Sequence, residues 1–380
     1  MIVGVPCESF PGERRVALVP ESVRRLVGIH LSVLVQSQAG QGAWFADDDY
    51  RRAGARIAPC ARDLFAQTDL VAKIHAPTVE EVEQLRRSAA IVCLLYPERH
   101  PEVARRLATG RVTAIAIENL PRTTIAQAMD VLSSQSTAAG YRAVILAANA
   151  LGKFFPMLMT PAGTIAPARV LVLGAGVAGL QAIATARRLG AVVQAFDVRA
   201  AARQEVESLG AKFITGPDLE DAATAEGYAR QLSEDALRRV RAVLQPALAS
   251  SDVCITGALV PRQRAPILLT RDMVQTMRPG SVIVDLAGEQ GGNCELTVPG
   301  KDIWVQGVAI LAPLHLPSDL AMDASRMYAR NMEKLILHFV RDGTLRFDFR
   351  DPIAEKCIVT HDGEIVPPEL RQALAALQGV

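Results

Sequence analysis

Three glycines and one aspartate near the middle of the chain have the types and spacing of a phosphate-binding loop. Gly174, Gly176 and Gly179 follow an apolar run, and Asp197 ends the next such run, 18 residues after Gly179. This pattern predicts a tight turn, a helix N-terminus facing a pyrophosphate and a carboxylate that accepts from a ribose. The carboxylate repels a 2′-phosphate and so favours NAD(H) over NADP(H), an exclusion that Arg199 would soften. The alternative is a glycine-rich packing turn without a ligand.

Four polar side chains precede a long apolar stretch at intervals of about one helical turn: Arg122, Gln127, Asp130 and Ser133. Apolar residues are expected to fill the opposite face of this helical segment: Ile125, Met129 and Leu132. Such a row of hydrogen-bonding groups lines a cleft, or it only caps and solvates the start of a helix. The segment alone does not decide between the two.

The elements that would position these residues form two α/β series. In the first series, strands are expected at 2–6, 31–36, 69–74, 89–95 and 113–118, and helices at 20–28, 80–89 and 101–110. In the second series, strands are expected at 169–174, 192–198, 211–215, 252–259, 281–287 and 308–312. Continuous apolar runs between helices are typical of a parallel sheet covered on both faces.

Two long helices, at 133–154 and from Pro317 to about Arg341, would join the two series. Residues 154–168 carry three prolines, which we expect to break regular structure, and the tail resembles a hairpin turning at Asp362-Gly363. The sequence therefore predicts two Rossmann-like α/β domains with mainly parallel sheets, the second inserted in the first. The boundaries expected for them are 1–132 plus 330–380 and, with the linking helices, 133–329. Clefts between domains commonly bind ligands.

Length and composition exclude several classes of protein. A chain of 380 residues suggests two domains. The net charge of +1, from 41 basic and 40 acidic side chains, argues against a nucleic-acid surface. The six cysteines are far apart and without a CxxC motif, which predicts no metal site and a reducing compartment. The most apolar run, 170–186, contains the three glycines and is interpreted as a buried strand and helix, so we expect a soluble chain without a signal peptide.

Long motifs across nearly the whole chain resemble one superfamily. These motifs are GVPCESFPGERRVALVPESV, DVLSSQSTAAGYRAV, GAGVAGLQAIATARRLGA, DVRAAARQEVESLGAKFI and MRPGSVIVDLAGEQGGNCELTVPG. They resemble the alanine dehydrogenase and proton-translocating transhydrogenase superfamily. SSQSTAAGYRAV and GGNCELTVPG resemble its transhydrogenase branch, in which the soluble NAD(H)-binding first part of the alpha subunit is encoded separately.

The resemblance gives the polar row a role. In that branch an Arg–Gln–Asp loop and a nearby serine hold the nicotinamide and its ribose, which implies this function for Arg122, Gln127, Asp130 and Ser133. It implies dinucleotide contacts at Gly174, Ala175, Gly176, Val177, Gly179, Asp197, Val198 and Arg199. It also implies a closing loop with Gly227 and Tyr228, and an adenosine contact at Leu259. The ordinary alternatives are a solvated tyrosine and simple sheet packing.

The two branches need different chemistry. An amino-acid dehydrogenase must bind a carboxylate and move protons, so it needs a cationic anchor and an acid/base group. By resemblance, alanine dehydrogenases carry a lysine and a histidine for this, where this chain has His75 and Tyr96. Arg15 stands at the place of the carboxylate-binding arginine, and His75 could act as a base or be an ordinary strand-end residue. Glu289 matches an acidic dehydrogenase position without an assigned role. Transhydrogenation moves a hydride between two C4 atoms and releases no proton there. It requires two nicotinamide rings held at ~3–3.5 Å with water excluded.

The transhydrogenase branch implies partners and a location. The chain would bind NADH and donate its hydride to NADP⁺ held by a partner domain, alongside membrane-spanning subunits that translocate protons. It would form a homodimer, insert no segment into the bilayer, and lie in the cytoplasm, peripheral to the inner membrane through those subunits. The alternatives are an alanine dehydrogenase-like NAD-dependent amino-acid dehydrogenase and a catalytically silent NAD-binding protein.

Overall fold

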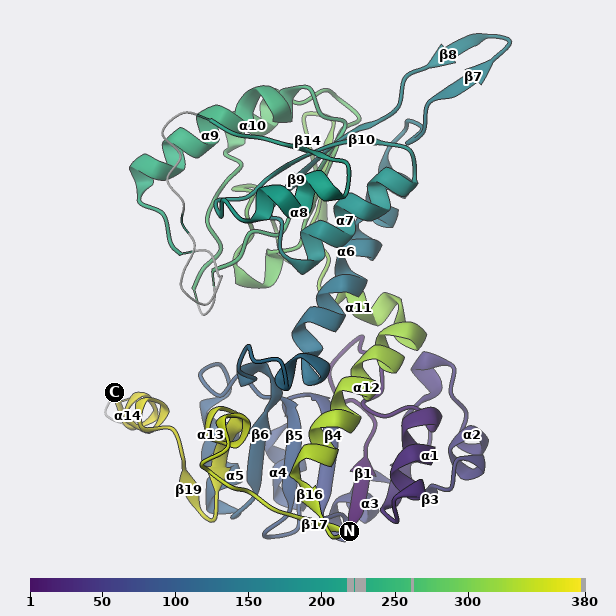
Figure 1. The fold of residues 1–380 in the computed structure, drawn as a ribbon, viewed down its shortest axis with the longest axis vertical. Helices are drawn as coiled ribbons and strands as arrows, with labels where there is room; N and C mark the ends of the chain where they lie inside the picture. Colours follow the sequence, from purple (N-terminus) through teal and green to yellow (C-terminus); the bar gives the residue numbers. More distant parts are fainter. Residues whose placement is uncertain (217–221, 223–229, 261–262, 377–380) are drawn as a thin grey trace. The chain divides into compact units, whose positions relative to one another are not determined.

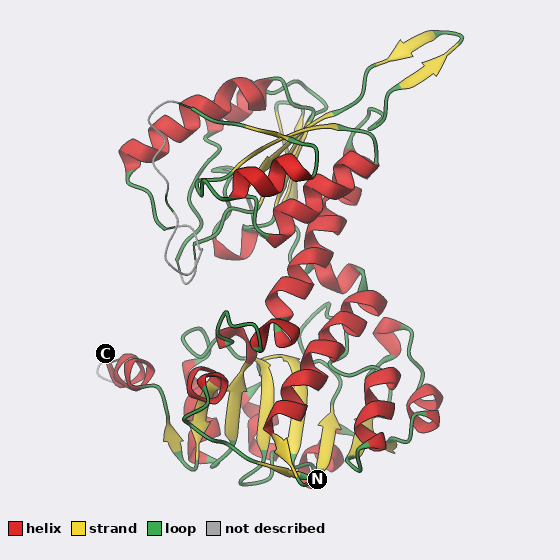
Figure 2. Cartoon of the chain, viewed as in Figure 1, coloured by secondary structure: helices red, strands yellow, loops and turns green. Residues whose placement is uncertain are grey.

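The computed structural model describes residues 1–216, 222, 230–260 and 263–376. The chain divides into two compact units, unit 1 with Met1–Gln135 and Pro317–Val380, and unit 2 with Ser136–Leu316. Each unit combines one large sheet with helices (Figure 2). This confirms the predicted α/β class. None of the described helices combines the length and the low polarity that crossing a bilayer requires.

Unit 1 is built on an eight-stranded sheet of order β19-β18-β6-β5-β4-β1-β2-β3 (Figure 1). Its strands are β1 (Ile2–Val5), β2 (Ser32–Gln36), β3 (Arg56–Ala58), β4 (Leu70–His75), β5 (Ala90–Leu94), β6 (Thr113–Ala116), β18 (Ile358–His361) and β19 (Glu364–Ile365). The pairs among β1 to β6 are parallel, and β18 is antiparallel to both neighbours. The strand order reverses direction between β1 and β4, where ligands of such sheets commonly bind.

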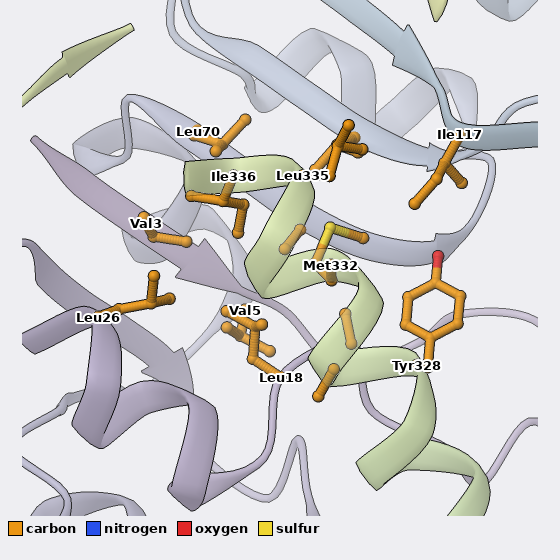
Figure 3. Close-up of a cluster of buried hydrophobic side chains, with 14 of the residues drawn as sticks. Val3, Val5, Leu18, Leu26, Leu70, Ile117, Tyr328, Met332, Leu335 and Ile336 are labelled. Atoms are coloured by element: carbon orange, nitrogen blue, oxygen red, sulfur yellow. The ribbon is translucent and has the colours of Figure 1, made fainter. Parts of the chain in front are cut away.

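Helices of unit 1 bury their apolar faces against this sheet. They are α1 (Pro20–Gly28), α2 (Asp47–Arg52), α3 (Ala61–Gln67), α4 (Val79–Gln84), α5 (Pro101–Thr109), α12 (Ala321–Phe339), α13 (Pro352–Cys357) and α14 (Pro368–Ala376). Short 3₁₀ turns lie at η1 (Gln41–Ala43), η2 (Ile117–Asn119) and η3 (Ala126–Met129), and a small ribbon joins β16 (Val340–Arg341) to β17 (Thr344–Leu345). Tyr328, Met332 and Ile336 of α12 lie in one buried cluster with Val3 and Val5 of β1 (Figure 3).

Unit 2 has a seven-stranded sheet of order β11-β10-β9-β12-β13-β15-β14. Its strands are β9 (Arg169–Leu173), β10 (Val192–Phe196), β11 (Lys212–Phe213), β12 (Val253–Thr256), β13 (Val282–Asp285), β14 (Asp302–Val305) and β15 (Val308–Leu311). Only the edge strand β14 is antiparallel within this described sheet. Its described helices include α7 (Val177–Arg188), α8 (Ala202–Ser208), α9 (Glu234–Ala249), α10 (Arg271–Gln275) and the 3₁₀ turn η4 (Gly288–Gln290).

Two helical connections carry the chain from unit 1 to unit 2 and back. The first is α6 (Val131–Ala150), which packs closely on α7 within unit 2. A Cβ atom at Gly140 of α6 would lie 2.1 Å from the carbonyl oxygen of Ala178, so only glycine permits this approach. The second was expected as one helix at 317–341. It is divided at Leu320 into α11 (Leu316–Asp319) and α12, because Leu320 leaves helical geometry at φ −106°, ψ 38°.

Three further local expectations differ from the structure. The helix expected at 80–89 ends at Gln84, because Leu85 is extended. Residues 154–168 were expected to be irregular but form a hairpin of β7 (Leu158–Thr160) and β8 (Gly163–Ile165). Its Pro161 lies in the turn, where its missing N–H removes no ladder bond. The tail hairpin is confirmed, with positive φ at both Asp362 and Gly363.

The third difference concerns the row at 122–133, which is not one helix. The 3₁₀ turn η3 ends at Met129, and Asp130 is extended (φ −73°, ψ 93°) before α6 begins. Met129 is buried, whereas Ile125 and Leu132 are 70% and 40% exposed. The expectation that these three apolar residues fill one face of a helix was therefore wrong, because the segment is interrupted at Asp130.

Candidate nucleotide-binding site

The glycine loop of unit 2 joins β9 to α7 as the sequence predicts. Gly174 has φ +93°, and a Cβ atom there would lie 2.9 Å from the amide nitrogen of Ala258. A Cβ at Gly179 would lie 1.9 Å from the carbonyl oxygen of Gly174. At Gly176, by contrast, a Cβ would meet no described atom within 4 Å. The first and third glycines are thus required by the protein's own packing, and the second leaves space where backbone meets a ligand.

The N-terminus of α7 is open to an anion. Gly176 is its N-cap, no side chain of the described residues caps it, and its first turn carries no acidic residue. Val177, the first helical residue, is 41% exposed. Free N–H groups and the positive end of the helix dipole bind phosphate groups. The loop therefore fits the pyrophosphate of a dinucleotide.

Asp197 follows β10 and faces this loop. Its Oδ2 accepts from the amide of Ala175 at 2.7 Å, which places the carboxylate beside the glycine turn. Its Oδ1 accepts from the amide and the Nε of Arg199, both at 2.9 Å, and its Oδ2 from Nη2 of the same guanidinium, also at 2.9 Å. Nη2 of Arg199 also lies 3.2 Å from the carbonyl oxygen of Ala175. The acidic residue and the arginine that the sequence singles out are thus directly paired.

The remaining described candidates of unit 2 follow the carboxyl ends of strands in the same sheet. The carbonyl of Val198 accepts from the amide of Ala222 at 3.1 Å. Leu259 follows β12 and is 41% exposed, so it is not simply buried in the sheet. Gly227 and Tyr228 lie outside the described residues.

Two residues without a predicted role hold the loop before Leu259. Asn293 accepts from the amide of Ala258 at 3.0 Å and donates to its carbonyl at 2.8 Å. Asp285, fully buried at the end of β13, accepts from the amide of Asn293 at 2.8 Å. Because Ala258 also lies against Gly174, these bonds fix one wall of the glycine loop. In the sequence, only the glycine-rich stretch GEQGGN indicates an unusual backbone at this wall. In the structure, Gly291 and Gly292 of this stretch have positive φ.

In unit 1 the predicted nicotinamide residues surround the start of α6. Asp130 accepts from the amide of Ser133 at 3.0 Å and from its hydroxyl at 2.5 Å. Asp130 therefore caps the start of α6, which is the alternative to ligand binding that the sequence left open. Arg122 and Gln127 are exposed. Ligand contacts of these four residues remain a prediction.

Arg15 and His75 of unit 1 form an ion cluster with Glu13 at the carboxyl ends of β1 and β4. Nε and Nη2 of Arg15 donate to Glu13 at 2.8 and 2.5 Å, and Nη1 donates to Gln135 at 2.7 Å. Nε2 of His75 lies 2.7 Å from Glu13, and the His75 ring stacks on Phe10. Burial alone would raise the pKa of Glu13, but its bonds from Arg15 and His75 hold that pKa well below its usual range.

This geometry leaves Arg15 poorly suited to anchor a substrate. Its side chain is 5% exposed, and its bidentate edge is already filled by the fully buried carboxylate of Glu13. A substrate carboxylate would have to displace that internal partner.

Tyr96 and Glu289 offer no stronger acid/base arrangement. The amide of Tyr96 donates to Glu118 at 2.5 Å, and the guanidinium of Arg99 lies 5.0 Å from its ring centre. Burial raises the pKa of Glu118 to about 7. Glu289, half exposed in unit 2, faces His315 at 3.5 Å.

Family models match almost the whole chain. The N-terminal domain of "Alanine dehydrogenase/PNT" matches residues 4–139, and the C-terminal domain matches residues 143–368. The chain belongs to the alanine dehydrogenase/PNT family. This confirms the superfamily that the motifs indicate.

Members of both branches of the alanine dehydrogenase/PNT family are similar to the chain. The first part of the NAD(P) transhydrogenase alpha subunit of Rhodospirillum rubrum is 46% identical over 97% of this chain and 99% of its own length. An "Alanine dehydrogenase" of Halomonas elongata is 34% identical over 96% and 94%. A solved transhydrogenase from Sinorhizobium meliloti superposes with a TM-score of 0.88 at 41% identity, covering 96% of this chain and all of that one. A solved L-alanine dehydrogenase gives 0.84 at 28% identity, covering 99% and 100%.

Proposed function

We propose that the chain binds NADH and donates its hydride to NADP⁺ held by a partner domain, as the soluble NAD(H) component of a proton-translocating transhydrogenase. The observation that carries this is the β9–loop–α7–β10 segment, with Asp197 bonded to the amide of Ala175 beside an uncapped helix N-terminus. The higher identity to transhydrogenase subunits than to alanine dehydrogenases supports the branch.

The protein's own residues would bind and orient the nucleotide. Gly176 and the first turn of α7 receive the pyrophosphate, Asp197 accepts from the adenosine ribose, and Leu259 contacts the adenosine. Arg122, Gln127, Asp130 and Ser133 supply the donors and acceptors that a carboxamide and a ribose need. Bound NADH supplies the hydride from C4. No group of the chain has to carry a proton in this reaction, and the internal pairing of Glu13 with Arg15 and His75 is compatible with that.

Purified chain alone distinguishes this function from an amino-acid dehydrogenase. With NADH, pyruvate and ammonium, we expect NADH to bind, NADPH to bind more weakly, and no NADH oxidation to occur. Fluorescence titration measures the binding of each nucleotide, and the absorbance of NADH measures its oxidation. Turnover would reject the proposal and would give Arg15, His75 and Tyr96 catalytic roles. Binding without any later transfer to a partner's NADP⁺ would leave a silent NAD-binding protein.

Partner subunits follow from the same proposal. An NADP(H)-binding domain supplies the acceptor, and membrane-spanning subunits bring this cytoplasmic chain to the inner membrane. We also propose a homodimer in which the β7–β8 hairpin contacts the second copy. The hairpin extends away from the seven-stranded sheet of unit 2 (Figure 1). It exposes Met157, Met159 and Ile165 at 56%, 80% and 38%. A lone two-stranded hairpin is marginally stable in water, and exposed apolar patches mark interaction surfaces.

Replacing Met159 by aspartate should therefore weaken self-association by roughly 100-fold, because an interface cannot bury an unpaired carboxylate cheaply. Val192→Asp is the matched control, since this half-exposed apolar residue lies outside the hairpin. Light scattering after size exclusion measures the mass. An M159D protein that stays dimeric at the same dilution as the wild type would show that the hairpin is not the interface.

A further inference from the structure

The carboxylate predicted to accept from the adenosine ribose is already saturated by the protein itself. Oδ1 of Asp197 accepts two bonds from Arg199, one from its amide and one from Nε. Oδ2 accepts from the amide of Ala175 and from Nη2 of Arg199. A carboxylate offers about four lone-pair positions, so every one is in use.

The arginine also covers this carboxylate from solvent. The side chain of Asp197 is 7% exposed, whereas that of Arg199 is 21% exposed and lies outside it. Nη2 reaches the carbonyl of Ala175 as well, so the guanidinium spans Asp197 and the glycine loop. A ribose hydroxyl that donates to Asp197 must therefore take the place of one of the guanidinium bonds.

We propose that Arg199 is a gate of the adenosine-ribose site, closing Asp197 in the nucleotide-free chain and exchanging its side-chain bonds for ribose hydroxyls when NADH binds. The proposal rests on the proposed function, because it assumes that Asp197 receives the ribose. The amide bonds from Ala175 and Arg199 persist through the exchange and keep the carboxylate oriented, while the side-chain bonds are the ones that leave.

The same exchange makes Arg199 a determinant of specificity. Once displaced, the guanidinium stays near the carboxylate, because Arg199 is only two positions from Asp197 in the sequence. It therefore stays close to the 2′ position of the ribose. Its positive charge attracts a phosphate group, so it partly offsets the repulsion between Asp197 and a 2′-phosphate. Arg199 thus weakens NADH binding by competition and strengthens binding of a 2′-phosphorylated ligand by attraction.

Calorimetric titration of the whole chain with NADH, 5′-AMP and 2′,5′-ADP tests both effects. In Arg199→Gln the dissociation constants for NADH and 5′-AMP should fall about 3- to 10-fold, and that for 2′,5′-ADP should rise about 10-fold. Arg199→Lys keeps the charge but loses the fork, so it should bind NADH more tightly and retain 2′,5′-ADP. Arg203→Gln is the matched control. Arg203 pairs with Glu207 on the exposed face of α8, and the change should leave all three constants unaltered.

Each result bears on one proposal only. If R199Q binds NADH and 5′-AMP no more tightly than the wild type, the gate is wrong and Arg199 is an ordinary ligand-binding residue. If R199Q and R199K lose 2′,5′-ADP equally, the specificity role is wrong. If the wild type binds none of the three ligands, the proposed function itself fails. Thermal midpoints of the variants confirm that the chains compared are folded.

Discussion

Replacing Gly179 by alanine should abolish NADH binding and lower the stability of unit 2. The new Cβ atom would lie 1.9 Å from the carbonyl oxygen of Gly174, so the turn or the helix must shift. The loss should exceed 100-fold in affinity, about 2.8 kcal/mol or more. Fluorescence titration with NADH and thermal unfolding measure the two effects.

Substitutions at two further glycines distinguish an effect on NADH binding from an effect on stability. Gly176→Ala places its Cβ in open space, so it should keep the wild-type melting temperature yet weaken NADH binding by roughly 10- to 100-fold, because the pyrophosphate approaches there. Gly152→Ala, whose Cβ also meets no described atom within 4 Å, should change neither. Wild-type affinity in both G176A and G179A would show that this loop does not hold the nucleotide.

Replacing Glu13 by glutamine should have the largest effect on stability. The change leaves the buried guanidinium of Arg15 without a charged partner, because the glutamine oxygen accepts a bond but carries no charge, and breaking a buried ion pair costs about 3–5 kcal/mol. Urea unfolding at pH 7 measures this. Asp348→Asn is the matched control. Asp348 accepts from Nε and Nη2 of Arg350 in the same bidentate, two-residue geometry, but both groups are exposed, so no measurable change is expected.

The contribution of Glu13 to the stability of the folded chain changes with pH in a defined direction. Because the pKa of Glu13 is lowered in the folded chain, its stabilising contribution is complete above the unfolded value near 4.5. It is lost as pH falls below that value toward the folded pKa. The stability difference between wild type and E13Q should therefore be present at pH 7 and should shrink as the pH falls below about 4.5. An equally stable E13Q at pH 7 would show that the Glu13–Arg15 pair stabilises nothing.

Most strands of the parallel sheets were predictable because each is a short continuous apolar run between helical patterns. The short edge strand β3, with the sequence RIA, and the edge strand β14 were not expected. The glycine loop was predictable because the spacing of the three glycines is specific, and Gly174 and Gly179 each have a steric cause in the protein's own packing. The β7–β8 hairpin was missed because three prolines in a short segment usually interrupt regular structure. Pro161, however, lies in the turn of the hairpin, where it is tolerated. The break at Asp130 was missed because residues about one helical turn apart fit one helix as well as two separate segments.

The contacts that shape the candidate sites could not be predicted because they join distant residues. Glu13 and His75 are 62 residues apart in sequence, and Asn293 holds Ala258 across 35 residues. Local periodicity carries no information on such pairs. Arg199 was singled out from the sequence, but only the structure shows that its guanidinium occupies the carboxylate of Asp197.

The most direct test of hydride donation by this chain follows an isotope. NADH carrying deuterium at the transferable C4 position is mixed with this chain, NADP⁺ and a purified NADP(H)-binding transhydrogenase domain, and the NADPH formed is analysed by mass spectrometry. We predict that the deuterium appears in NADPH without exchange into water, and only when both proteins are present. Label lost to water, or NADPH formation that does not need this chain, would contradict direct hydride donation from NADH bound here.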